Sequence, residues 1–241
     1  MFRKKLAAGV ALALAVAIGL QANVTSFGKE KNKKTFKVRI ENISAADGVA
    51  TDGGAKYPFA LSPGMFVVNH RKHYFFDEGG RADAALEAQA EDGSPELLSK
   101  KYLTKVGGIY TGVFNKPVGS EMPAPILPGG VYEFTFTATE GMRLSLIAMY
   151  GQSNDLFYAP KQALELFDEN GDPLTGDITA SLGLWDAGTE VNQAPGIGDE
   201  QAPRQKEKNT GTAEKGKVGP VKDAFAYPNT KDVLRVTITA E

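Results

Sequence analysis

The sequence lacks cysteine altogether, and it contains only two histidines and one tryptophan. The absence of cysteine excludes disulfide bonds, cysteine nucleophiles, thiolate zinc sites and thiol redox chemistry. With only His70 and His73 present, most imidazole-based catalysis is also excluded. A fold without disulfides depends on its hydrophobic core for stability, and a chain of 241 residues is long enough to bury one.

Basic residues are not in excess. The chain has 27 Lys and Arg against 29 Asp and Glu, which gives a formal net charge of −2. Binding to nucleic-acid phosphates needs clustered Lys and Arg, so the composition argues against a nucleic-acid partner. The one Lys-rich stretch, GKEKNKK at 28–34, is interpreted as a solvated spacer.

Long apolar runs are confined to the beginning of the chain. A basic start is followed by an apolar run that ends at Leu20, and the small residue Ala22 follows. This layout is typical of a signal peptide. We therefore expect residues 1–22 to be a signal peptide and 23–34 a polar spacer. The processed chain would then be exported, periplasmic or secreted, and without a membrane span; an uncleaved amino-terminal anchor is the alternative.

Apolar and polar residues alternate in several segments. In the first of them Phe36, Val38 and Ile40 share one face. Such alternation is typical of half-buried strands in antiparallel sheets. The clearest segments are 35–42, 131–138, 143–150 and 232–239. The sequence thus predicts one all-β antiparallel sandwich domain over residues 35–241, in which the first and last strands pair.

One segment of different composition interrupts the strands. Residues 81–102 are rich in Ala, Leu and Glu, and Ser94-Pro95-Glu96 is a typical helix start. We expect one or two short inserted helices here. Residues 192–219 have almost no large apolar side chain, which predicts a long surface loop.

Two segments offer weaker metal sites. His70 and His73 lie three apart in a region that predicts strand or loop, where such positions face opposite sides. The aromatic residues 74–76 beside them are expected in the core. Residues 167–177 are similar to a calcium loop, but Pro173 stands where an EF-hand needs glycine. The Asn-Gly pair in this segment instead favours a hairpin with a type I′ turn.

The only tryptophan, Trp185, lies in LWDAGTEVN (184–192) beside Asp186 and Glu190. Asp155 follows a predicted strand, and all three acids neighbour large apolar residues. Carboxylates held together against a core repel one another unless a cation neutralises them. Calcium accepts about six to eight oxygen ligands in flexible geometry. The three acids are therefore candidate calcium ligands, although Asp and Gly are also ordinary turn formers.

The segments QSNDLFYAP and LWDAGTEVN, followed by APG, QAPRQ and YP…DVLRVTIT, resemble the spondin N-terminal domain in its bacterial exported form. The resemblance runs from about Thr35 to the end, and WDAGT is its most specific element. It implies a C2-like antiparallel β-sandwich with Ca²⁺ held by loop acids, which at the matching positions are Asp155, Asp186 and Glu190. Glu190 stands where the family pattern has Asp. The cysteines of the animal domains are absent, so no disulfide is implied.

The resemblance implies a non-catalytic module that acts in binding or adhesion outside the cytoplasm. Its extracellular or envelope ligand, a protein, glycan or lipid, is left open by the sequence. A glycosidase-like hydrolase that pairs Asp155 with Asp186 or Glu190 is one alternative. Against it, no acid has an evident environment for a raised pKa, and no Ser-His-Asp or zinc-protease pattern occurs. An ion-free structural envelope protein is the other alternative.

Overall fold

The first and last strands lie side by side. The structure, a computed structural model, describes residues 32–51, 53–72, 75–103 and 110–241, which belong to the compact unit Lys31–Glu241. In it β1 (Lys33–Asn42) pairs antiparallel with β13 (Leu234–Ala240), so the predicted pairing of the first and last strands of the chain is confirmed. Phe36, Val38 and Ile40 are all buried, as their alternation predicts.

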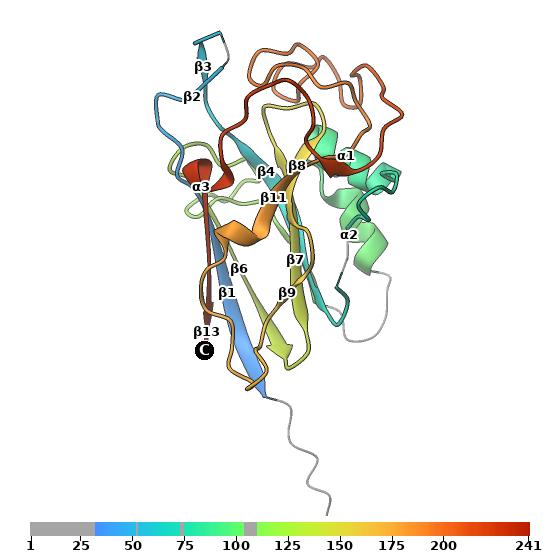
Figure 1. The fold of residues 1–241 in the computed structure, drawn as a ribbon. Helices are drawn as coiled ribbons and strands as arrows, with labels where there is room; N and C mark the ends of the chain where they lie inside the picture. The colour runs from blue at the N-terminus through green and yellow to red at the C-terminus, as the bar shows by residue number, and fades with distance from the viewer. Residues whose placement is uncertain (1–31, 52, 73–74, 104–109) are drawn as a thin grey trace, which may run out of the picture. The chain divides into compact units, whose positions relative to one another are not determined.

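The domain has a separate two-stranded sheet, β2-β3, and two larger antiparallel sheets (Figure 1). The smaller of these two has the order β10-β13-β1-β6, and the larger has the order β12-β11-β8-β7-β4-β5 with β9 paired to β7. The further strands are β2 (Val49–Ala50), β3 (Lys56–Tyr57), β4 (Leu61–Asn69), β5 (Tyr110–Phe114), β6 (Val131–Thr139), β7 (Arg143–Tyr150), β8 (Leu156–Pro160), β9 (Leu164–Glu165), β10 (Gly176–Asp177), β11 (Leu182–Asp186) and β12 (Gly219–Pro220). The predicted all-β sandwich is confirmed.

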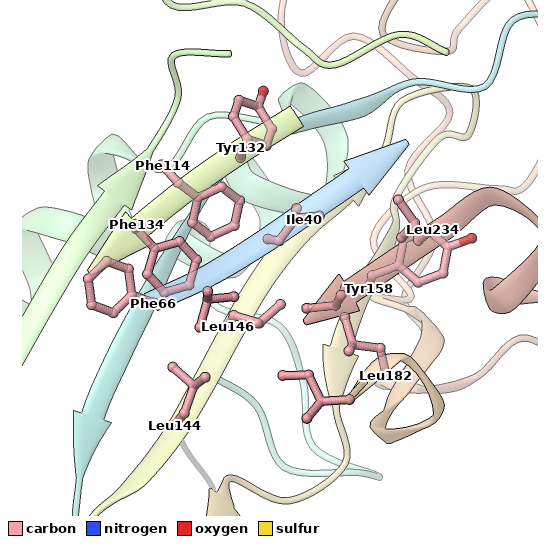
Figure 2. Packing of buried hydrophobic residues seen from close by; sticks show 14 of the residues in the cluster. Ile40, Phe66, Phe114, Tyr132, Phe134, Leu144, Leu146, Tyr158, Leu182 and Leu234 are labelled. Carbon is pink, nitrogen blue, oxygen red and sulfur yellow. The ribbon is translucent and has the colours of Figure 1, made fainter. Parts of the chain in front are cut away.

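The main core lies between the two sheets. Figure 2 shows Phe66 of β4 against Phe134 of β6, and their ring centroids are 4.2 Å apart. Phe114 stacks on the ring of Phe134 with ring centroids 5.3 Å apart, and Leu144 and Leu146 of β7 are buried. Stacked aromatic rings bury large apolar areas, and such burial is the main stabilising contribution in a domain without disulfides.

The other face of the larger sheet is also covered. Two helices, α1 (Ala84–Asp92) and α2 (Glu96–Leu103), pack there over a second apolar cluster that includes Ile147 and Trp185. Strand β7 is consequently buried on both faces. The expectation of one wet face for residues 143–150 was wrong, because the inserted helices cover the face that would otherwise meet solvent.

The prediction of one or two short helices in this segment is confirmed, and two are present. The α1 helix begins after Asp83, whose Oδ1 accepts hydrogen bonds from the backbone N–H groups of Ala85 at 3.2 Å and Leu86 at 3.1 Å. It ends at Gly93, which has a left-handed φ of 60°. The predicted helix start at 94–96 is also confirmed, since α2 begins at Glu96. Short helical elements also occur at α3 (Thr230–Val233) and in a 3₁₀ turn (Thr179–Ser181).

The predicted hairpin between 167 and 177 is present, but its turn is of another type. The backbone N–H of Asp168 donates to the Asp172 carbonyl at 2.9 Å. Gly171 has a φ of 85°, whereas Asn209 is the one non-glycine residue with positive φ in the described part of the chain. Asn170 therefore cannot take its place in a type I′ turn, which needs positive φ at both central residues. Instead, Asp168 Oδ1 accepts from the Asn170 N–H at 2.8 Å.

The predicted signal peptide, residues 1–22, lies outside the described residues. The predicted spacer, residues 23–34, lies outside them up to residue 31, and its last two residues belong to β1, which begins at Lys33. In the described ranges, no helix combines the length and the apolar character that crossing a membrane requires.

Candidate functional site at the loop end

Antiparallel pairing of β8 with β11 brings two of the predicted acids together. Asp186 stands opposite Leu156 in this register, and Asp155 directly precedes Leu156. The backbone N–H of Ala187 extends the ladder by donating to the Asp155 carbonyl at 3.2 Å. Trp185 anchors this edge, since its Nε1 donates to the carbonyl of Ala159 at 2.9 Å. The tryptophan thus fixes the strand end from which Asp186 projects.

Asp155 is completely buried, with 0% of its surface exposed. Its Oδ2 accepts three hydrogen bonds, from the Thr189 N–H at 2.7 Å, the Thr189 hydroxyl at 3.1 Å and the Glu190 N–H at 3.1 Å. Its Oδ1 has no hydrogen-bond partner among the described residues. Burial, followed by the negative charge of Asp186, raises the pKa of Asp155 to about 7.

Asp186 lies at the border between the core and a surface cleft. Its Oδ1 accepts from the Gly188 N–H at 2.6 Å, and its Oδ2 accepts from Asn192 Nδ2 at 2.7 Å. It lines a cleft of about 650 Å³ together with Glu214 and Asp223. Burial is the main cause that raises its pKa, and the charge of Asp223 adds to it. Of the three predicted acids, Asp186 is the least buried.

Glu190 is only 3% exposed, and its carboxylate lies against the 192–219 loop. Oε1 accepts from the Gly211 N–H at 2.9 Å, and Oε2 accepts from Asn154 Nδ2 at 3.5 Å. Burial raises its pKa, and the additional charges acting on it are those of Glu200 and Asp92. The backbone of Glu190 thus touches Asp155, while its side chain is engaged with the long loop.

The long loop is part of the site. It contains no helix, and no strand before Gly219, as predicted. Backbone N–H groups of the loop donate to the carbonyls of the WDAGTE segment: Gly216 to Gly188 at 2.9 Å and Glu214 to Thr189 at 2.7 Å. In Figure 1 this loop, coloured orange to red, runs close to α1. The loop therefore holds the acid-bearing segment in place.

A fourth acid, Glu91, lies at the same end of the sheet and was not predicted. It is on the last turn of α1, is 2% exposed, and its Oε2 has no hydrogen-bond partner in the described ranges. Burial raises its pKa to about 8, and the charges of Glu190 and Asp155 contribute. One signal in the sequence could have revealed it: an acid at a helix C-terminus opposes the helix dipole, and no basic residue accompanies it in the last turn of α1.

These four residues, Glu91, Asp155, Asp186 and Glu190, are called the acid cluster below. In the part of the chain that the structure describes, none of these four acids forms an ion pair with a basic side chain. Two buried carboxylate oxygens without partners and a missing countercharge suit a hard, oxygen-seeking cation such as calcium. The side chains do not converge on one point, since no group of three or more His, Asp or Glu positioned to hold a metal ion occurs in the described ranges.

The remaining candidates from the sequence lie elsewhere. His70 is exposed, and its Nδ1 is 2.9 Å from the carbonyl oxygen of Gly141. His73 and Tyr74 lie outside the described residues. Phe75 is buried, and Phe76 packs against Trp185 with centroids 4.8 Å apart, so these two aromatic residues belong to the core, as expected.

Comparison with known proteins adds no family assignment. The sequence matches no protein-family model, and no curated protein matches it.

Proposed function

We propose that this chain is an exported, non-catalytic β-sandwich module of the spondin N-terminal type. In this proposal it binds calcium at its loop end, where Asp155 and Asp186 at the paired ends of β8 and β11 lie beside the 192–219 loop. Asp155 and Asp186 are the principal ligands in this proposal, and Glu190 is the third acid. The module acts in binding or adhesion in the cell envelope or outside the cell, toward a protein, glycan or lipid.

One observation carries the calcium proposal. Asp155 Oδ1 is buried without a hydrogen-bond partner in the described part of the chain, and the charge of Asp186 acts on the same carboxyl group. A buried carboxylate oxygen without a partner is costly, and a bound cation removes that cost. Calcium suits the site better than magnesium, because it tolerates irregular oxygen ligands and loses water more readily.

Glu190 joins the ion only if its carboxylate leaves Gly211 and Asn154. The two contacts have lengths of 2.9 and 3.5 Å, so the second is weak. The backbone of Glu190 already lies beside Asp155, since its N–H donates to Asp155 Oδ2. We therefore expect a change of side-chain rotamer to redirect the carboxylate without movement of the strands.

Thermal unfolding with EDTA and with about 10 mM calcium tests the proposal. Sites in extracellular modules bind with dissociation constants of roughly 10⁻⁴–10⁻³ M, so calcium should raise the midpoint by about 3 to 10 °C. Asp186→Asn should abolish the rise. Asp172→Asn is the matched control, because this exposed acid lies in the hairpin that lacks the EF-hand register, and the variant should respond like the wild type. A wild-type midpoint that calcium does not change would contradict the proposal.

A carboxylate-based hydrolase is favoured by one observation, the pKa of about 7 for Asp155, which suits a general acid. Its complete burial works against this role, because a general acid must reach the substrate. Turnover of a glycan that is lost in Asp186→Asn would favour the hydrolase over the binding module.

A further inference from the structure

Glu91 is a buried acid that the proposed calcium site does not use. It is carried by α1, and it is 98% buried because only 2% of its surface is exposed. Its Oε2 has no hydrogen-bond partner among the described residues. At the C-terminal end of a helix its charge also opposes the helix dipole. Nothing within its own helix therefore explains an acid at this position.

The charges around Glu91 make the position more costly. Those that act on it come from Glu190, Glu87 and Asp155, which are all acids. Each raises the free energy of the charged form of Glu91, as burial does. Two changes can relieve this cost: a proton on Glu91, or a cation shared with its neighbours.

Thr189 connects Glu91 to the calcium ligands. Its hydroxyl donates to Asp155 Oδ2 at 3.1 Å, and its side chain also interacts with the Glu91 carboxyl. A hydroxyl has one hydrogen, so it can donate to only one of the two acids at a time. The hydroxyl therefore cannot serve Glu91 while it donates to Asp155, whose Oδ2 also accepts hydrogen bonds from the backbone N–H groups of Thr189 and Glu190.

We propose that Glu91 is an additional ligand of the calcium ion, so that the ion ties α1 to the start of β8 and the end of β11. The inference rests on the proposed function and extends it to a residue outside the WDAGT segment. Two carboxylate oxygens without partners, Glu91 Oε2 and Asp155 Oδ1, supply free acceptors, and both belong to side chains more than nine-tenths buried. Calcium draws these carboxylates together by side-chain rotation, since it accepts about six to eight oxygens in irregular geometry.

The test uses terbium as a luminescent substitute for calcium. Trp185 is the only tryptophan and directly precedes Asp186, so excitation of this residue sensitises a terbium ion bound in the site. Displacement of terbium by calcium then gives the calcium affinity of the wild type and of each variant. We expect Glu91→Gln to weaken calcium binding about tenfold or more. Glu87→Gln removes an acid one turn earlier on α1, and it should change the affinity less than about twofold because it lies farther from the ion.

The outcomes separate this inference from the proposed function. If the wild type binds no calcium, or if Asp155→Asn binds it as tightly as the wild type does, the calcium site itself is absent. If Asp155→Asn loses binding while Glu91→Gln retains the wild-type affinity or binds more tightly, only the role of Glu91 is overturned.

Hydrogen exchange of the wild-type protein gives a second test that does not depend on a variant that folds. Calcium should slow exchange of the amides in the last turn of α1 as well as those of residues 187–190. Protection confined to 187–190 would overturn the proposed role of Glu91.

Discussion

Thr189 donates both its backbone N–H and its hydroxyl to a single oxygen, Asp155 Oδ2, at 2.7 and 3.1 Å. These two bonds join segments that are 34 residues apart in the sequence. They also leave the other carboxylate oxygen of Asp155 without a partner in the described ranges. The stability of the loop end therefore depends on whether this buried acid carries a proton, a charge or a bound ion.

Without metal, the protein should lose stability as the pH rises from 5 to 8. Asp155 has a pKa of about 7 in the folded protein against an ordinary value of 3.8, so the folded state keeps a proton that the unfolded chain has released. The free energy of unfolding then falls with pH across this interval, by roughly 2.5 kcal/mol from Asp155. Glu91, with a pKa of about 8, adds to the decrease.

Chemical denaturation in EDTA at several pH values measures this dependence. Asp155→Asn should flatten the curve, whereas Asp172→Asn should leave its slope unchanged. Saturating calcium should reduce or reverse the slope, because the ion binds the deprotonated acids. A metal-free protein that becomes more stable between pH 5 and 8 would argue against the protonated state of the acid cluster.

Gly188→Ala should destabilise the protein by about 3 kcal/mol or more. Gly188 has a φ of 67°, and a β-carbon there would lie 2.6 Å from the backbone nitrogen of Lys217, which cannot move aside without breaking the loop pairing. Gly119→Ala is the matched control, since Gly119 has a φ of 83° with open space around its β-position. The control should cost only the strain of positive φ, about 1–2 kcal/mol. Equal losses in the two variants, measured by urea unfolding, would show that the loop yields to the methyl group.

Cleavage after Ala22 is the expected fate of the amino terminus in cells. Mass spectrometry of protein recovered from the periplasm or the medium should identify Asn23 as the first residue. Recovery in the membrane fraction with residues 1–22 still attached would instead support the uncleaved anchor.

The strands could be predicted because alternation along a strand records which face is buried. Residues 35–42 and 131–138 follow this rule in the structure, with every second side chain in the core. Residues 143–150 do not, since the cover over their second face comes from helices distant in the sequence. A local pattern contains no information about such a cover.

The candidate site was predictable in part for similar reasons. Asp155 and Asp186 stand at the ends of paired strands, so their proximity follows from the sheet. The direction of the Glu190 side chain depends on Gly211, in a loop without periodicity, and could not be derived from the sequence. The place of Glu91 near Glu190 and Asp155 depends on how α1 packs against the larger sheet, which local sequence does not determine. Its unfavourable position at the end of the helix was the one local sign.

The placement of β1 has a consequence for how the polypeptide acquires its fold. β1 lies between β6 and β13, and Phe36 pairs with Ala240 at the far end of the sequence. Until β13 has emerged from the ribosome or crossed a translocation pore, one edge of β1 is unpaired and open to association with other chains. Joining such distant segments is also slow, since a large loop must close first. The nascent protein should therefore depend on chaperone protection until β13 has been synthesised or transported and can pair with β1.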